Sequence, residues 1–235
     1  MATKMTKQRA TREQVMELIR QLGVGTAIPS ERQLSADLGV SRLTLRAALD
    51  ELAQEGYLVR RQGSGTYVQR PKISQQLTMT SFSEDMRRRG MVPSSRTLSL
   101  ARQLAGARLG RFLNVSPGEE ILVAKRLRLA DGDSMAIETL HLLASTVPGL
   151  KPHDLDGSFY ELLSERYGIE ILTGTQIVEA TVTNEEESAA LALPLHSPAF
   201  LFKRTSRDAG GRTVEFVHSV YRGDRYQIVS ELTSS

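Results

Sequence analysis

The fold of this chain is decided by residues 28–68, IPSERQLSADLGVSRLTLRAALDELAQEGYLVRRQGSGTYV. Ser30 precedes an apolar pattern and Gln33 follows three residues later, a spacing that predicts a helix opened by a capping box. After a short turn at Gly39-Val40, Ser41 is expected to cap the next helix. The expected buried stripe of that helix is Leu45, Ala48, Leu49 and Leu52. Two helices joined by so short a turn indicate a helix-turn-helix.

The sequence on either side of this helix pair completes a small domain. A helix is expected before it, because apolar residues recur at helical spacing at Val15, Leu18, Ile19 and Leu22. After it, the β-branched and aromatic segments 57–59 and 66–68 flank Gln62-Gly63-Ser64-Gly65. This pattern predicts a hairpin whose glycine-rich tip can approach a DNA backbone closely. The first domain is therefore predicted to be a winged helix-turn-helix.

The outer face of the second helix of the pair carries the chemistry. Arg42, Thr44 and Arg46 lie away from its apolar stripe. Arginine presents a fork of N–H donors that fits guanine or phosphate. Leu43 is expected on the solvent side, where a thymine methyl would suit it. The alternative is that these arginines only solvate a helical bundle, as most surface arginines do. The turn, the caps and the hairpin together favour DNA binding.

Charge is distributed unevenly along the 235 residues, whose net charge is +3. Residues 1–70 hold eleven Lys or Arg and seven Asp or Glu (+4), and the remainder holds nineteen and twenty (−1). A basic segment on a neutral body favours contact with a polyanion. The chain has no cysteine, which excludes disulfides and thiol chemistry. Because we find no long apolar run and no signal-peptide pattern, we expect a cytoplasmic protein without membrane contact.

A second domain is expected after the polar segment around Pro71. We predict the winged helix-turn-helix over 1–70, a linker over 71–78 and an effector-binding domain over 79–235. Strand patterns occur at about 94–103, 119–130, 134–142, 174–183, 199–208, 212–222 and 225–232. Helical patterns occur at 82–90, 106–114, 158–167 and 184–193. Hairpin turns at Asp131-Gly132 and Gly210-Gly211 predict a largely antiparallel sheet, and hence an α+β domain.

Polar residues share strand faces with apolar ones in this second domain. Arg126 and Arg128 alternate with buried-type residues on one strand, and Glu138 does so on the next. Glu215 and Tyr221 share a face of a later strand. A carboxylate with apolar neighbours needs hydrogen-bond donors, which either a ligand or an arginine can supply. An Arg–Glu pair between neighbouring strands therefore remains as an alternative to a ligand site.

Two serine-opened helices add to the case for an anion. Ser81-Phe82-Ser83-Glu84 and Ser158-Phe159-Tyr160-Glu161 both have the spacing of a capping box. Helix N-termini present free N–H groups and partial positive charge, which suit phosphate or carboxylate. With the two arginines they predict a phosphate pocket. The simpler alternative is that these serines only cap their helices.

The first domain resembles the GntR family of bacterial regulators. The resemblance lies in IPSER (28–32), VSR (40–42), TLR (44–46), GYL (56–58) and QGSGTYV (62–68). It implies DNA contacts by Arg32, Arg42, Thr44, Arg46 and Gly65. Ser41, Gln62 and Gly63 lie beside these residues and are included in the predicted DNA-binding surface.

The second domain resembles the UTRA effector domain of the HutC branch of that family, a fold shared with chorismate lyase. Its motifs resemble the N-acetylglucosamine-utilisation regulators, in SFSEDM (81–86), RG (89–90), RLR (126–128), MAIET (135–139), SFY (158–160), VEF (214–216) and SVYRGDRY (219–226). The resemblance implies that an effector phosphate is bound by Ser83, Arg126, Arg128, Ser158 and Tyr160. It implies that the sugar is lined by Phe82, Glu138, Glu215 and Tyr221.

These observations predict a DNA-binding transcription regulator, expected to be a repressor of amino-sugar metabolism. We expect a homodimer on a short inverted-repeat operator, with N-acetylglucosamine 6-phosphate or glucosamine 6-phosphate as effector and no cofactor. One alternative keeps the fold but senses another phosphorylated or carboxylated metabolite. A different alternative is an enzyme acting on a small anion, with Glu138 and Glu215 as an acid–base pair. The sequence offers that enzyme no nucleophile motif and no metal-ligand spacing among its four histidines.

Overall fold

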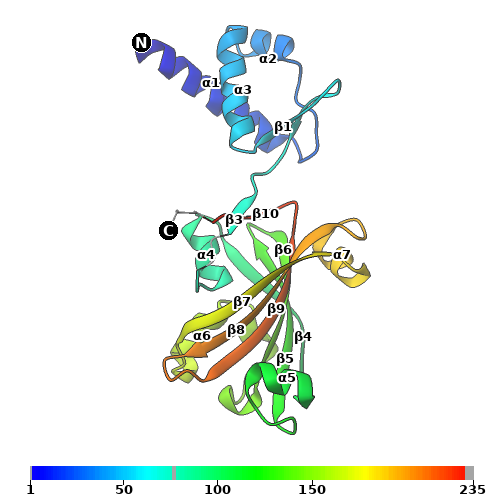
Figure 1. Cartoon of the computed structure of the whole chain (residues 1–235). Helices are drawn as coiled ribbons and strands as arrows, with labels where there is room; N and C mark the ends of the chain where they lie inside the picture. The colour runs from blue at the N-terminus through cyan, green and yellow to red at the C-terminus, as the bar shows by residue number, and fades with distance from the viewer. Residues whose placement is uncertain (1, 76–77, 231–235) are drawn as a thin grey trace, which may run out of the picture. The chain divides into compact units, whose positions relative to one another are not determined.

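The computed structural model describes residues 2–75 and 78–230, with side chains described from residue 7 onward. The chain forms two compact units, Met1–Ile73 and Ser74–Ser235 (Figure 1). In the described parts of the chain, no helix combines the length and apolar character needed to span a membrane.

The first unit is a three-helix domain with a hairpin. It consists of α1 (Ala2–Gln21), α2 (Glu31–Asp37), α3 (Arg42–Gln54), β1 (Leu58–Arg61) and β2 (Gly65–Val68). Its core combines the predicted stripes of the helices with residues of the hairpin, namely Val15, Ile19, Ile28, Leu34, Leu45, Leu49, Leu52, Leu58 and Val68. The segment before α2 also joins the hairpin, since the Ile28 N–H donates to the Thr66 carbonyl at 2.9 Å. The predicted winged helix-turn-helix is confirmed.

The helix starts follow the serine pattern only in part. The Ser30 Oγ accepts from the Gln33 N–H at 3.3 Å, and the Ser41 Oγ accepts from the Thr44 N–H at 3.2 Å. The prediction of a full capping box at Ser30 was wrong, because only its serine half forms. The boxes predicted at residues 81–84 and 158–161 also form only their serine halves. At the second of these, Glu161 is instead paired with Arg87.

The second unit is built on a six-stranded antiparallel sheet in the order β4-β5-β6-β9-β8-β7. The strands are β4 (Pro93–Leu104), β5 (Glu120–Ala130), β6 (Asp133–Leu143), β7 (Ile171–Val182), β8 (Pro198–Asp208) and β9 (Thr213–Arg222). The β5–β6 turn has positive φ at Asp131 (51°) and Gly132 (81°), as expected for a tight two-residue hairpin. β6 pairs with β9 although they are far apart in sequence, and this crossover brings the polar strands together.

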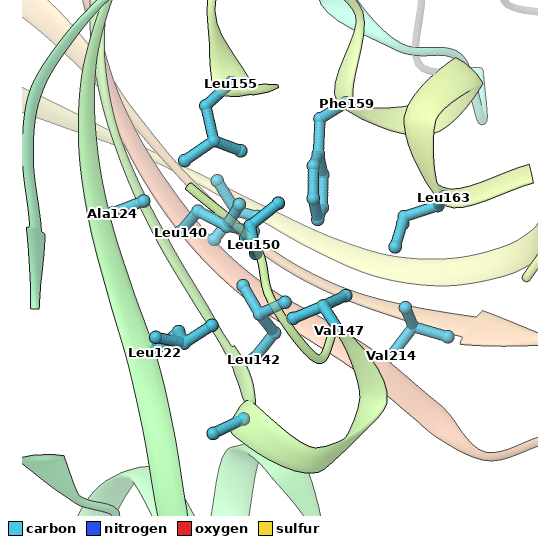
Figure 2. Close-up of a cluster of buried hydrophobic side chains, with 12 residues drawn as sticks. Leu122, Ala124, Leu140, Leu142, Val147, Leu150, Leu155, Phe159, Leu163 and Val214 are labelled. Carbon is cyan, nitrogen blue, oxygen red and sulfur yellow. The ribbon is translucent and has the colours of Figure 1, made fainter. Parts of the chain in front are cut away.

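Helices cover both faces of this sheet. They are α4 (Phe82–Arg88), α5 (Gly106–Leu113), α6 (Phe159–Tyr167) and α7 (Glu185–Leu191), with short 3-10 turns η1 (Ala144–Thr146) and η2 (Pro152–Leu155). Figure 2 shows Leu122 and Leu140 of the sheet packed with Phe159 of α6 in the main core. α5 and α7 pack on the opposite face, through Leu113 and Leu191. Arg126 and Arg128 alternate with the residues of the main core, so they lie on the α6 side.

The sequence prediction differs from the structure near the ends of this unit. β3 (Ile73–Gln75) lies inside the segment predicted to be an irregular linker, and it pairs with β10 (Tyr226–Ile228). The final strand was predicted over 225–232, but β10 is much shorter, and β3, with which it pairs in the described part of the chain, is also three residues long. Residues 231–232 lie outside the described part of the chain.

Candidate functional site

The first candidate site is the outer face of α3 in the first unit. Arg42 and Leu43 are exposed, and Leu43 as a residue is 70% exposed, as the sequence predicted. The Ser41 cap fixes the start of the helix, and its hydroxyl also lies 2.8 Å from the Thr44 hydroxyl. The helix therefore presents a short polar N-terminal turn with an arginine and an uncovered leucine, a surface suited to a DNA groove.

Arg46, one turn further along α3, is held by a carboxylate of α2. Its Nη2 and Nε donate to the Glu31 Oε2 at 2.8 and 3.1 Å. The neighbouring Arg32 is exposed. A solvent-exposed pair of this kind contributes little to stability, so Arg46 can exchange Glu31 for a phosphate at little cost.

The hairpin tip, residues 62–65, follows α3 in the sequence, is exposed, and takes its shape from glycine. Gln62, Gly63 and Gly65 are all exposed. Gly63 has φ +71° and Gly65 φ +114°, conformations that L side chains rarely adopt. The tip therefore presents backbone groups with little side-chain cover, which suits a close approach to a phosphate chain.

The second candidate site is a buried polar cluster on the α6 side of the sheet. The register places Arg126 directly opposite Glu138, and the Arg126 Nε donates to the Glu138 Oε1 at 2.9 Å. The Arg126 Nη1 donates to the Leu155 carbonyl at 3.1 Å. The Arg–Glu pair kept as an alternative in the sequence analysis therefore exists at this position. Burial raises the pKa of Glu138, but Arg126 and Arg128 outweigh it and lower the pKa to about 2.

Arg128 differs from Arg126 because its guanidinium makes no hydrogen bond to Glu138, although its Nη1 lies 3.8 Å from the Glu138 Oε1 as a longer ion pair. Its Nη2 donates to the Ser83 Oγ at 3.2 Å and its plane lies 4.6 Å from the Phe82 ring centroid. The Arg128 Nε and Nη1 are buried without a hydrogen-bond partner, and the residue is only 2% exposed. Burial and the neighbouring Arg126 lower its pKa to about 10, so it is still charged at neutral pH. A buried cation with unused donors is the chemistry of an anion site.

Glu215 lies across the cluster from these arginines. It accepts hydrogen bonds from the Tyr160 hydroxyl at 2.7 Å and from the Ser206 hydroxyl at 2.9 Å. Burial raises the pKa of Glu215 above its ordinary value, although Arg204 opposes this. Burial likewise raises the pKa of Tyr221 to about 12, so this tyrosine keeps its proton and can donate it in a hydrogen bond.

Two adjoining cavities open onto this cluster. The smaller has an empty volume of about 270 Å³ and is lined by Ser81, Phe82, Arg126, Arg128, Glu138, Phe159, Tyr160, Arg204, Glu215 and Val217. The larger has an empty volume of about 450 Å³, and its walls include Tyr221, Ser219 and Gln176. Ser81, Phe82, Arg204 and Val217 belong to both cavities. The smaller cavity carries three guanidinium groups and two carboxylates, so it favours an anion.

The structure brings most of the predicted pocket residues together, although they come from five separate segments, α4, β5, β6, α6 and β9. Ser83 reaches the cluster through Arg128, and Tyr221 lies at the larger cavity. Ser158 is not among the wall residues of either cavity. Its hydroxyl accepts from the Glu161 N–H at 3.4 Å, as expected for a serine that only caps its helix.

Arg204 is a site residue that the sequence reasoning missed. It lies on β8, and its guanidinium is 5.7 Å from the Tyr160 ring centroid. A signal for it existed, because alternation along the predicted strand 199–208 places Arg204 on one face with Phe202 and Ser206. Burial lowers the pKa of Arg204, but the neighbouring Tyr160 and Glu215 raise it above its ordinary value.

Comparison with known families agrees with both sites. Residues 7–68 match the model described as bacterial regulatory proteins of the gntR family, and residues 88–227 match the UTRA domain. These matches define the class of the protein, a bacterial transcription regulator with an effector domain. The chain belongs to the GntR family, in the HutC branch that carries a UTRA domain. Its relatives are named as transcriptional regulators, so the chain is a regulator and not an enzyme.

Individual relatives are similar over nearly the whole chain. The HTH-type transcriptional repressor NagR of Bacillus subtilis is 36% identical over 203 residues, which cover 86% of this chain and 84% of NagR. The repressor PhnF of Mycolicibacterium smegmatis is 31% identical and covers 95% of this chain and 91% of its own. The crystal structure of PhnF from Mycobacterium smegmatis superposes with a TM-score of 0.78 at 28% identity, over 96% of this chain and all of the other.

Proposed function

We propose that this chain represses genes of amino-sugar metabolism in the cytoplasm, binding a short inverted-repeat operator as a homodimer. A sugar phosphate such as N-acetylglucosamine 6-phosphate or glucosamine 6-phosphate is the effector. The DNA contacts are those of α3 and the hairpin tip: Arg32, Ser41, Arg42, Thr44, Arg46, Gln62, Gly63 and Gly65. The effector lies in the two adjoining cavities of the UTRA domain. The repressor and amino-sugar assignments draw support from the similarity to NagR.

The state of Arg128 carries the proposal of a phosphorylated effector. Its Nε and Nη1 are buried without hydrogen-bond partners, and its third nitrogen, Nη2, already donates to Ser83. Leaving a buried charged donor unsatisfied is costly, so the site favours a ligand that supplies acceptor oxygens. A phosphate offers three such oxygens and the matching charge. The sugar is then expected against Phe82, Glu138, Glu215 and Tyr221.

A second effector class is favoured by the range of relatives. PhnF is similar over a larger share of this chain than NagR is. A protein named as the histidine utilization repressor of Pseudomonas putida is also 28% identical over 204 residues. The UTRA fold therefore accompanies relatives with different names, and another phosphorylated or carboxylated metabolite is the alternative ligand.

Isothermal calorimetry with matched ligands tests the proposal. Glucosamine 6-phosphate and N-acetylglucosamine 6-phosphate should bind at least about tenfold more tightly than the free sugars, since each charge-assisted hydrogen bond contributes about 1.5–3 kcal/mol. Inorganic phosphate should bind weakly at the same site. Equal affinity for phosphorylated and free sugars would exclude the phosphate assignment. Tighter binding of a carboxylate metabolite would favour the alternative effector.

Operator titrations with and without saturating effector test the switch. In a symmetric dimer the recognition helices must match half-sites roughly 34–36 Å apart. If the effector changes that spacing, the two affinities are coupled, typically by about 1–3 kcal/mol, and the coupling is reciprocal. The same factor should therefore appear when effector is titrated with and without operator. Identical operator affinity in both conditions would mean that the sugar phosphate does not act as the switch.

A further inference from the structure

The start of α4 lies between two arginines, the buried Arg128 and the half-buried Arg204. On one side, Ser83 accepts from Arg128 and the Phe82 ring lies against the same guanidinium. On the other side, the Arg204 Nη1 donates to the Thr80 carbonyl at 3.2 Å, immediately before the Ser81 cap. Only the first contact belongs to the phosphate site proposed above. The second has no role in that proposal.

Arg204 has the position and the free donor to contact a ligand. It lies in the walls of both cavities, at their junction. Its Nε is fully buried and has no hydrogen-bond partner. Guanidinium is a donor with no acceptor capacity, so the group that would satisfy this nitrogen must carry an acceptor oxygen. Neither Tyr160 nor Glu215 fills this role, because neither forms a hydrogen bond with the Arg204 Nε.

Arg128 and Arg204 line different parts of the pocket and can therefore contact different parts of one ligand. Arg128 lines only the smaller cavity, whereas Arg204 lines both cavities. A ligand that places its phosphate at Arg128 and extends into the larger cavity passes Arg204. We infer that Arg204 is a second effector-binding residue, which binds an acceptor oxygen of the non-phosphate part of the effector, a hydroxyl, ring or carbonyl oxygen. This inference rests on the proposed function of the pocket.

The hydrogen bond to Thr80 also connects Arg204 to the start of α4. Thr80 precedes α4 in the segment that follows the DNA-binding unit along the chain. A ligand oxygen on Arg204 competes with, or reinforces, its bond to the Thr80 carbonyl. This bond therefore links the ligand pocket to the residues leading into α4. Arg204 variants should lose part of the coupling between effector and operator as well as effector affinity.

Calorimetry on Arg204→Gln and Arg204→Lys with two probes tests the inference. Arg204→Gln should weaken glucosamine 6-phosphate binding by about tenfold or more, the effect of one charge-assisted hydrogen bond, and change inorganic phosphate binding by less than about threefold. Arg204→Lys keeps the charge but not the fork and should lie between. Arg128→Gln should weaken both probes alike. Lys203→Gln is the matched control, because it removes a charge from the other face of the same strand, where Lys203 pairs with Glu179.

The outcomes separate this inference from the proposed function. If the wild-type chain binds neither probe, the proposed function and this inference both fail. If wild type binds both and Arg204→Gln weakens both equally, or neither, only the role of Arg204 is overturned. Thermal melting of each variant without ligand serves as the folding control. If Arg204→Gln does not fold, Arg204→Lys decides, since unchanged selectivity between the two probes in that variant also overturns the inference.

Discussion

Each unit of this protein contains an Arg–Glu pair, and the two pairs differ in almost every physical respect. Arg46 and Glu31 of the first unit are 60% and 33% exposed. Arg126 and Glu138 of the second are 3% and 8% exposed. The first pair joins neighbouring helices across a turn, and the second joins adjacent strands in register. The same two residue types therefore serve one surface and one interior.

Because of this difference in burial, the two arginines differ in how easily they can change partners. In water an ion pair contributes about 0–1 kcal/mol, so Arg46 is free to change partners when DNA arrives. In the interior, removing one partner leaves an uncompensated buried charge. Arg126 is therefore committed to Glu138, and the adjacent Arg128 is left with unused donors for a ligand.

The largest expected difference between the pairs is in folding stability. Arg126→Ala should lower the free energy of unfolding by about 3–5 kcal/mol, because Glu138 then stays buried without its partner. Arg46→Ala should lower it by about 0–1 kcal/mol. Urea denaturation at neutral pH measures both. Equal losses in the two variants would mean that burial does not distinguish the pairs.

Acid should also separate the two pairs. The pKa of Glu138 is about 2 in the folded protein and 4.5 ordinarily, so the pair stabilises the folded state above pH 4.5. This stability, about 3 kcal/mol, is lost as the pH falls from about 4.5 towards about 2. Denaturation at several pH values should show a smaller acid loss for Glu138→Gln than for wild type. A wild-type acid profile in Glu138→Gln would contradict the assignment.

A substitution in one unit should change the affinity for that unit's ligand and leave the affinity for the other ligand unchanged. Arg128→Gln should weaken sugar-phosphate binding about 10- to 100-fold, since it removes charge-assisted hydrogen bonds, and leave effector-free operator binding unchanged. Arg42→Ala should weaken the operator complex and leave sugar-phosphate affinity unchanged. Calorimetry measures the sugar-phosphate affinity of both variants, and operator titration measures their operator affinity. If either variant folds normally but loses both sugar-phosphate and operator affinity, the two sites are not independent.

The smallest expected effect is on the salt dependence of operator binding. If Arg46 exchanges Glu31 for a DNA phosphate, Arg46→Ala should flatten the slope of log K against log salt by about 0.9. Operator titrations at several salt concentrations measure the slope. If Arg42→Ala and Arg46→Ala both bind operator as tightly as wild type does, the assignment of α3 as the recognition helix is wrong.

Much of the fold was predictable because its signals are local. Ser30 and Ser41 cap helices where the sequence placed them, and the glycines of the hairpin tip have the positive φ that makes glycine necessary. Alternation along the strands placed Arg126, Arg128, Glu138 and Glu215 on their faces correctly, and these residues do gather at one cavity. The failures were also instructive. β3 was missed because a three-residue strand has too short a pattern to detect, and Glu161 of one predicted capping box pairs with Arg87 instead.

The sequence by itself determined the two-domain organisation, the faces of the strands and the polar character of the pocket, since these depend on helical and strand periodicity within single segments. Which arginine is hydrogen-bonded to Glu138 and which keeps unused donors followed from the tertiary structure alone. That choice depends on the register of β5 against β6, which sets Arg126 opposite Glu138, and on the β6–β9 crossover. It also depends on β8, which places Arg204 at the junction of the cavities. Period-two alternation assigns a residue to a face of its own strand, but it carries no information about which distant strand lies beside it.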